Sequence, residues 1–297
     1  MKRIFYSNIN YSCNSNCVFC YSHNTIHTGK PHKEIACLKL SEYWTRFKVD
    51  SFDRVIINGG EPLLHQEITE IFKILTQLGC ETLVYTNGRL ASLLQYKFID
   101  VPTFRFIIPV HGYRELHDEI TGVPGSYDQM LTGIQSLMNK RCKVDLKIII
   151  NSKMVADENS FNKTFESLKK IPFNNAIHIT KMTETIVSKK NCFSGVDNQN
   201  ASFYTEKLVN FFIPKGIVKI FDTCVKDISK HINTPLPAFN EPLEVFFKDC
   251  ANEKKIELTP PIMDCWCRCS SREICKSAVS EYTVLEFSNN QVRINLE

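Results

Sequence analysis

Strand-like and helix-like segments alternate about six times between Arg3 and Met182. Each strand-like segment is a short apolar run that ends in a loop, after which apolar residues recur with helical spacing. Such repeats build a parallel sheet, because parallel strands need a crossover between them. The pattern therefore predicts an α/β protein with a partial, TIM-like (β/α)6 barrel. The expected strands are 3–9, 53–59, 81–88, 103–112, 142–151 and 175–182, and the expected helices are 40–49, 68–79, 126–140 and 159–171.

Short polar or glycine-containing motifs stand at the ends of five of these strands. Three cysteines follow the first strand, and the others end in NGGEP (58–62), TNG (86–88), PVHG (109–112) and IN (150–151). In a barrel of strand–helix units, the loops after the carboxyl ends of the strands carry the chemistry. The five motifs are therefore expected to meet on one face.

The cysteine motif places Cys13, Cys17 and Cys20 within eight residues. A structural zinc site uses four ligands and a disulfide uses two thiols, so a group of three indicates an incomplete metal centre. Thiolates suit iron–sulfur clusters and zinc, and three of them on a four-iron cluster leave one iron open for chemistry. The alternative is a zinc site completed by His23 or His27.

Composition limits the classes of partner. The apolar fraction is 43%, enough for a large core, and the net charge of +4 without a dense Lys/Arg stripe argues against a nucleic-acid partner. No segment resembles a secretory signal or a membrane span, so the expected location is the cytoplasm, with no membrane partner. The 13 cysteines then do not form a disulfide framework. Four scattered cysteines are expected to be small buried residues: Cys37, Cys80, Cys142 and Cys192.

The pattern changes after Met182, which predicts a barrel domain over 1–182 and a smaller C-terminal domain over 183–297. The second part contains a helix-like segment (203–216), a strand-like segment (217–224) and a hairpin-like end around Asn289 and Asn290.

A second group of cysteines lies in this C-terminal part, and such density in a cytoplasmic chain indicates a metal. The preferred interpretation is one auxiliary [4Fe–4S] cluster, and the alternatives are structural zinc or redox-active or buried thiols. Five cysteines exceed the four positions of one cluster, so one is spare. The five are Cys250, Cys265, Cys267, Cys269 and Cys275.

The N-terminal motifs together resemble the radical S-adenosylmethionine (SAM) superfamily. The Cys-x3-Cys-x-aromatic-Cys pattern followed by Tyr21 is similar to its first signature, and GGEP at 59–62 to its second. The segments 85–88 and 111–137 resemble its peptide-modifying branches, so the resemblance covers about the first 180 residues. The interval from Cys269 to Cys275 is similar to part of the auxiliary-cluster domains called SPASM and twitch, although the full SPASM pattern is absent.

The resemblance implies a [4Fe–4S] cluster on Cys13, Cys17 and Cys20, with SAM bound to the open iron. An electron donor such as flavodoxin or ferredoxin would reduce the cluster. The cluster would then cleave SAM to a 5′-deoxyadenosyl radical, which abstracts a hydrogen atom from the substrate. The protein binds and orients these groups and excludes water.

The resemblance also implies cofactor-binding roles for particular residues. The backbone of Gly59 and Gly60, with Glu61 beside it, would approach the amino group of SAM, because glycine has no Cβ to block it. The remaining expected contacts are Phe19 at the adenine, and Asn87 and Asn151 at the methionyl and ribose parts.

The chain departs from the family at two positions. Pro109 and Thr121 stand where relatives often carry Ser and Arg, and His111 is the expected substitute for the lost contacts. Cys224 follows a strand-like segment and is the candidate catalytic hydrogen-atom donor, although the favoured interpretation is a buried thiol without a role in catalysis or metal binding.

Three functions remain open at this stage. The first is a radical SAM enzyme that crosslinks, epimerises or forms a thioether in a ribosomally made peptide, although no separate leader-binding domain is evident before Cys13. The second is a radical SAM enzyme that acts on a small molecule, a nucleoside or a tRNA base. The third is a binding protein that holds a cluster or zinc without catalysis.

Overall fold

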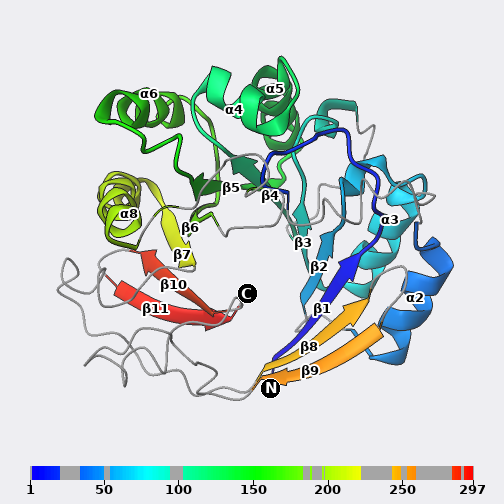
Figure 1. Cartoon of the computed structure of the whole chain (residues 1–297). Helices are drawn as coiled ribbons and strands as arrows, with labels where there is room; N and C mark the ends of the chain where they lie inside the picture. Colours follow the sequence, from blue (N-terminus) through cyan, green and yellow to red (C-terminus); the bar gives the residue numbers. More distant parts are fainter. Residues whose placement is uncertain are drawn as a thin grey trace.

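The computed structural model (Figure 1) describes residues 2–20, 34–49, 54–93, 103–182, 188, 196, 198–221, 243–248, 253–258, 283–288 and 291–296. These residues form an α/β protein built on one 11-stranded sheet, in the order β11-β10-β7-β6-β5-β4-β3-β2-β1-β8-β9.

The first seven strands lie side by side in chain order and are all parallel. They curl into a barrel that does not close, because β9 and β11 are the edges of the sheet. This confirms the predicted partial barrel and adds a seventh strand to the six expected. The strands are β1 (Lys2–Asn8), β2 (Arg54–Asn58), β3 (Glu81–Tyr85), β4 (Phe104–Val110), β5 (Lys143–Ile150), β6 (Ala176–Lys181) and β7 (Ile217–Phe221).

The helices cover the outer face of this sheet (Figure 1). Their apolar sides are buried against the strands, and α3 ends at Gly79 in the left-handed conformation, as its sequence predicts. The helix α4 was not expected. The helices are α2 (Cys37–Arg46), α3 (Ile68–Leu78), α4 (Arg114–Thr121), α5 (Ser126–Asn139), α6 (Glu158–Leu168) and α8 (Asn198–Phe212), with 3₁₀ turns η1 (Pro62–Leu64), η2 (Ala91–Leu93) and η3 (Ile213–Lys215).

The four remaining strands extend the sheet at both edges. β8 (Leu243–Lys248) is parallel to β1, and β9 (Glu253–Leu258) is antiparallel to β8. At the other edge, β10 (Thr283–Ser288) is antiparallel to β7, and β11 (Gln291–Leu296) forms the expected hairpin with β10. β7 and β8 therefore follow each other in the chain but lie at opposite sides of the barrel. The domain boundary after residue 182 stays a prediction.

Apolar residues pack on both faces of the curved sheet, because successive side chains of a strand point to opposite faces. The larger core lies between the sheet and the helices and includes Trp44 and Phe72. A smaller group fills the inside of the barrel between β1 and β4: Ile4, Ile56, Leu83 and Ile107. The prediction of buried cysteines is confirmed for Cys37, Cys80 and Cys142, whereas Cys192 lies outside the described residues.

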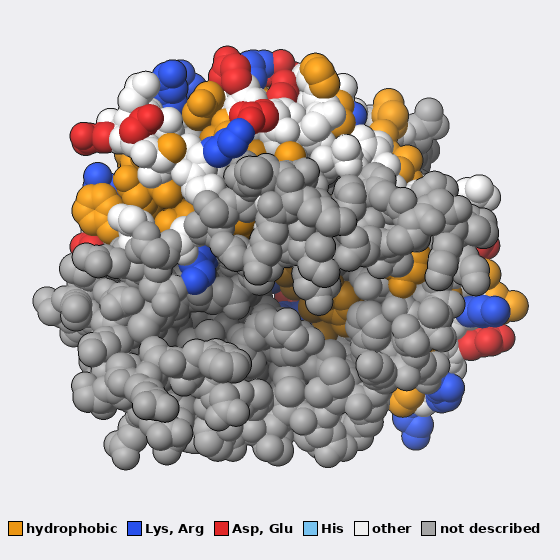
Figure 2. Space-filling view, viewed as in Figure 1, with side chains coloured by type: hydrophobic (Ala, Val, Ile, Leu, Met, Phe, Trp, Pro, Cys, Tyr) orange, Lys and Arg blue, Asp and Glu red, His pale blue; other side chains and the backbone are white. Residues whose placement is uncertain are grey.

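The outer surface mixes apolar and charged side chains. Figure 2 shows hydrophobic side chains near α6 and α8, where Phe203 is half exposed and the Lys207 ammonium lies 4.5 Å from its ring centroid. In the part of the chain that is described, no helix is both long and apolar enough to cross a bilayer.

Candidate active site

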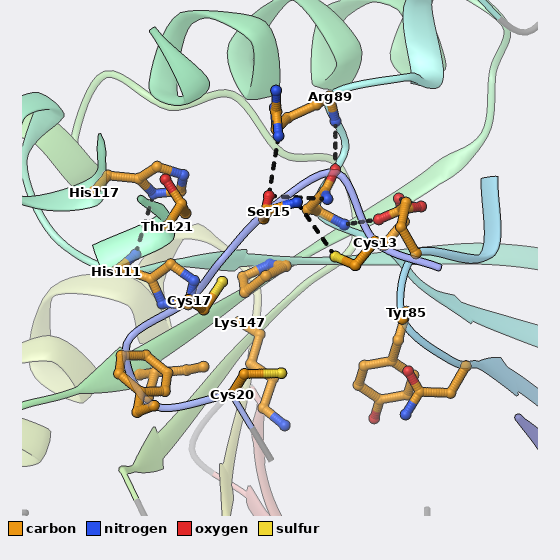
Figure 3. Close-up of a pocket in the computed structure, with 18 of the residues that line it drawn as sticks. Cys13, Ser15, Cys17, Cys20, Tyr85, Arg89, His111, His117, Thr121 and Lys147 are labelled. Carbon is orange, nitrogen blue, oxygen red and sulfur yellow. Dashed lines mark hydrogen bonds between the residues drawn. The ribbon is translucent and has the colours of Figure 1, made fainter. Parts of the chain in front are cut away.

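A cavity of about 380 Å³ opens at the carboxyl ends of the strands, where the motifs were expected to meet. It is lined by the cysteine segment and by residues from the ends of β2 to β6 (Figure 3). The predicted site residues on its wall are Cys13, Cys17, Phe19, Cys20, Gly59, Gly60, Glu61, Asn87 and His111.

The three thiols of the cysteine segment line this one cavity and are partly exposed. Burial raises the pKa of Cys13 to about 11 and that of Cys17 to about 12, so both thiols are protonated at neutral pH without a metal. Among the described residues, no group of three His, Cys, Asp or Glu side chains could hold a metal ion. His23 and His27 lie outside those residues.

The cysteine segment is attached to the end of α4. The backbone N–H groups of Asn16 and Val18 donate to the carbonyl oxygens of Thr121 and Ile120 at 2.8 and 2.9 Å. The last carbonyls of a helix have no partner inside the helix, so they are free to accept these bonds. The Thr121 hydroxyl lies 2.6 Å from the Ser126 hydroxyl. Thr121 thus holds the segment through its backbone.

Gly59 and Gly60 pack against the start of the same segment. A Cβ on Gly59 would lie 2.6 Å from the carbonyl oxygen of Asn10, and a Cβ on Gly60 would lie 2.7 Å from the carbonyl carbon of Ser12. The N–H groups of Gly60 and Glu61 donate to Asn10 and Ser12 at 3.0 and 2.7 Å. The two glycines are therefore needed for the approach of the cysteine segment, and their contact with SAM stays a prediction.

Glu61 is a buried carboxylate at the junction of two loops. It accepts hydrogen bonds from the Thr86 hydroxyl at 2.6 Å, from the N–H of Asn87 at 2.8 Å and from the N–H of Leu63 at 3.0 Å. Burial raises its pKa, and the three donors oppose that effect. Glu61 therefore fixes the TNG loop relative to the GGEP loop.

Asn87 and Arg89 extend from the TNG loop to the cysteine segment. The Asn87 amide donates to the side-chain oxygen of Asn14 at 2.7 Å. The Arg89 guanidinium donates to the backbone carbonyl of Asn14 and, at 3.0 Å, to the Ser15 hydroxyl. Figure 3 shows the Arg89 and Ser15 side chains above the three thiols. Asn87 lies where the sequence predicts, whereas Arg89 was not predicted.

His111, Phe19 and His117 form an aromatic group on the cavity wall. The His111 ring lies 5.2 Å from each of the other two ring centroids. Burial keeps the pKa of His111 well below its usual range and lowers that of His117 to about 4, so both rings are neutral at pH 7. The Nδ1 atom of His111 is buried and has no hydrogen-bond partner among the described residues. Buried polar atoms are normally hydrogen-bonded, so this atom lacks a partner of the kind that a bound ligand supplies.

Asn151 lies beneath the cavity and is not part of its wall. Its side chain is fully buried and donates to the carbonyl oxygen of His111 at 2.9 Å, and it accepts from the N–H of Met154 at 2.9 Å. These bonds occupy the amide, so the structure gives Asn151 a supporting position behind His111. Its expected contact with SAM stays a prediction.

A sequence model of the radical SAM superfamily matches residues 7–159, which is just over half of the chain. The chain belongs to the radical SAM superfamily. The matched region contains the cysteine segment and the strands β2 to β5 that surround the cavity.

Two curated relatives carry the names of different enzymes. The AdoMet-dependent heme synthase of Methanosarcina barkeri is 29% identical over 163 residues, which cover 54% of this chain and 45% of the relative. The probable GTP 3′,8-cyclase of Saccharolobus solfataricus is 26% identical over 203 residues, which cover 67% of this chain and 63% of the relative. The chain thus spans less than two thirds of either relative.

Solved structures with bound S-adenosylmethionine share the fold at low sequence identity. SuiB of Streptococcus suis, bound to S-adenosylmethionine, superposes with a TM-score of 0.60 at 11% identity, covering 86% of this chain and 62% of SuiB. The structure of anSMEcpe with bound AdoMet and a peptide superposes with a TM-score of 0.56 at 14% identity, covering 72% of this chain and 60% of that one. Both support the open barrel described above.

The residues present fit the cofactors of a radical SAM protein. Three soft thiol ligands face one cavity, which is the donor set that a [4Fe–4S] cluster with an open iron requires. His111 lines the same cavity, and its buried Nδ1 atom has no hydrogen-bond partner among the described residues. The second group of cysteines and Cys224 lie outside the described residues.

Several wall residues were missed by the sequence reasoning. Lys147 comes from β5, Thr180 and Lys181 come from β6, and Tyr85 ends β3. The Lys147 ammonium lies 5.4 Å from the Tyr85 ring centroid. Charged residues within a mostly apolar strand, as in KVDLKIII at 143–150, are a usable signal, because charged residues are rarely placed in buried strands without a partner or a role.

Proposed function

We propose that this protein is a radical SAM enzyme that reductively cleaves S-adenosylmethionine and abstracts a hydrogen atom from a ribosomally made peptide. One observation carries the proposal: Cys13, Cys17 and Cys20 line a single cavity together with the GGEP and TNG loops. Family membership supports a [4Fe–4S] cluster with SAM at this place. The cluster would supply the electron that splits SAM into methionine and a 5′-deoxyadenosyl radical.

The chain's own residues would bind and orient the reactants. Asn87 and Arg89 hold the cysteine segment in place, and Glu61 holds the loop that carries both of them. The Nδ1 atom of neutral His111 would accept a hydrogen bond from SAM, or donate one in the other tautomer. Phe19, against His111, would cover the adenine and exclude water.

The peptide as substrate is supported by two structural relatives. SuiB has been solved with its precursor peptide SuiA and shares the fold with a TM-score of 0.59 at 12% identity. The structure of anSMEcpe contains AdoMet together with a peptide. The substrate modification would be a crosslink, a thioether or an epimerisation.

The second candidate is a radical SAM enzyme that acts on a small molecule or nucleoside. The curated relatives named as a heme synthase and a GTP 3′,8-cyclase favour it, because their sequences are closer to this chain than those of the peptide-bound structures. The cavity wall carries the cations Arg89, Lys147 and Lys181, which suit carboxylate or phosphate groups.

The sequence further supports an auxiliary [4Fe–4S] cluster on cysteines of the C-terminal group, Cys250, Cys265, Cys267, Cys269 and Cys275, with zinc as the alternative. Cys224 would be a hydrogen-atom donor to the substrate radical. A flavodoxin or ferredoxin would deliver the electron. The auxiliary cluster, the role of Cys224 and the electron donor are all parts of this proposal.

The deciding experiment is anaerobic reconstitution followed by reduction in the presence of SAM. The wild-type protein should form 5′-deoxyadenosine, and Cys17→Ala should abolish its formation because the cluster loses one of three ligands. The measurement is product quantification by mass spectrometry. If the reconstituted wild-type protein forms no 5′-deoxyadenosine, and its reduced-state spin spectrum does not respond to SAM, the protein is a binding protein.

Two further measurements test the substrate class and the second cluster. A mass change on precursor peptides encoded near this protein's gene, and not on nucleotides or porphyrins, would favour a peptide substrate. About eight irons per chain would support two clusters, whereas about four irons with one zinc would refute the auxiliary cluster. Cys267→Ala should retain SAM cleavage if the second cluster serves only the substrate.

A further inference from the structure

Arg89 connects the cysteine segment to the helix α5. Its Nε donates to the side-chain oxygen of Gln129 on α5 at 2.7 Å. On the other side, its Nη1 donates to the carbonyl oxygen of Asn14 and to the Ser15 hydroxyl. One guanidinium therefore holds two consecutive residues of the cysteine segment against the outer helix layer.

The contacts of Arg89 continue to a cysteine sulfur. The backbone N–H of Ser15, whose hydroxyl accepts from Arg89, donates to the Cys13 Sγ at 3.4 Å. Figure 3 shows this path from the guanidinium through Ser15 to the thiol. Hydrogen bonds to cluster sulfurs and nearby charge are two of the factors that set the reduction potential of an iron–sulfur cluster.

We infer that Arg89 is a positioning residue for the cluster, with two separable effects. Its planar fork holds residues 14 and 15 so that the Ser15 N–H points at the Cys13 sulfur, and its positive charge stabilises the reduced, more negative cluster. The inference goes beyond the proposed reaction, and the part that concerns the cysteine segment holds for the protein before the cluster is inserted.

The two effects require different features of the side chain. A lysine keeps the charge but has no planar fork, so it cannot bond Gln129, Asn14 and Ser15 at once. A glutamine removes the charge and most of the donors. Comparison of Arg89→Lys with Arg89→Gln therefore separates geometry from charge. Arg114→Gln is the matched control, because Arg114 pairs with exposed Asp128 on α5 and lies over the Tyr127 ring.

The first test is hydrogen exchange on the full chain before reconstitution, followed by mass spectrometry of peptides that cover residues 13–18. Both Arg89 variants should exchange about tenfold faster there, since each charge-assisted bond contributes about the free energy of a tenfold change. Exchange in α3 reports whether the variants fold. Should they fail to fold, Ser15→Ala removes one acceptor of Arg89 and should still accelerate exchange. Unchanged exchange in the folded variants, or in Ser15→Ala, would overturn the geometric effect.

The second test is the midpoint potential of the reconstituted cluster, measured without SAM. Arg89→Gln loses both the geometry and the charge, so it should shift the potential to a more negative value than Arg89→Lys does, whereas Arg114→Gln should stay near wild type. If Arg89 had only a structural role, the midpoint potentials of the lysine and glutamine variants would shift equally. This result would overturn the charge effect. If wild type binds a cluster but does not cleave SAM, the proposed reaction fails while both tests of Arg89 keep their meaning.

Discussion

Glu61 shows how single residues hold the site together. Its side chain is buried, and its two oxygens accept from two backbone N–H groups and one hydroxyl in separate loops. Arg89 acts in the same way between the cysteine segment and α5. At the residue scale, the site therefore depends on buried polar groups whose partners lie far apart in the sequence.

Glu61→Gln should lower the free energy of unfolding by about 1–3 kcal/mol, because an amide offers only one acceptor oxygen. Whichever way the amide turns, the N–H of Leu63 or of Asn87 then faces another donor. The measurement is urea unfolding of the anaerobically purified protein. Glu70→Gln is the control, since Glu70 pairs with Lys73 on the surface and its loss should change little. Equal stability of the two variants would contradict this role.

The elements position the site through close backbone contacts. The end of α4 binds the backbone of the cysteine segment through Ile120 and Thr121. The helix α5 approaches the TNG loop at Gly133, where a Cβ would overlap the backbone of Gly88. Small residues are required at such contacts, because any added atom separates the elements.

Gly133→Ala tests the contact between α5 and the loop. In an exposed helix, alanine would stabilise by about 1 kcal/mol relative to glycine, so any loss measures the steric conflict. We expect a loss of at least about 2 kcal/mol in urea unfolding. Gly79→Ala is the comparison, because nothing lies within 4 Å of its added Cβ and only the left-handed backbone, with φ +68°, is strained. A Gly133→Ala protein that is as stable as Gly79→Ala would refute the packing argument.

In the whole molecule, a layer of paired charges lies inside the barrel below the cavity. Arg54 on β2 pairs with Glu81 on β3 at 2.6 Å, and Arg105 on β4 lies 3.4 Å from Glu81 and 3.3 Å from Asp145 on β5. His178 on β6 is 2.7 Å from Asp145. The ion pairs and hydrogen bonds of this layer connect five neighbouring strands, so they stabilise the curved shape of the open barrel.

This layer makes stability depend on pH. Burial lowers the pKa of His178 to about 4, below the unfolded value of about 6.5. Between these values the unfolded chain binds a proton that the folded chain does not, so the free energy of unfolding falls as the pH falls. Burial opposes the Asp145 charge, but the His178 bond and nearby cations lower the pKa of Asp145 to about 2. Protonation of Asp145 therefore lowers the free energy of unfolding further below about pH 4.

His178→Gln should reduce that dependence, because glutamine keeps a donor for Asp145 but does not titrate. Between pH 7 and pH 5, the variant should lose about 2 kcal/mol less unfolding free energy than wild type. The measurement is urea unfolding at both pH values. Parallel pH profiles for the two proteins would contradict the prediction.

Local patterns predicted most of the barrel and the main parts of the site. The alternation of apolar strands and helices predicted six parallel strands, and the positions of the motifs at strand ends predicted that they would share one face. Both are confirmed. Asn151 was placed at the right strand end, but its side chain points into the supporting structure behind His111. A motif indicates the loop and not the direction of a side chain within it.

The sequence alone determined the strand–helix order and the group of three thiols, because both depend on spacing along the chain. Only the tertiary structure decided that β8 and β10 extend opposite edges of one sheet, and that Arg89 reaches Ser15 across 74 residues. Strand pairing and hydrogen bonds between distant residues depend on how the helices and strands pack, and local periodicity carries no information about that packing.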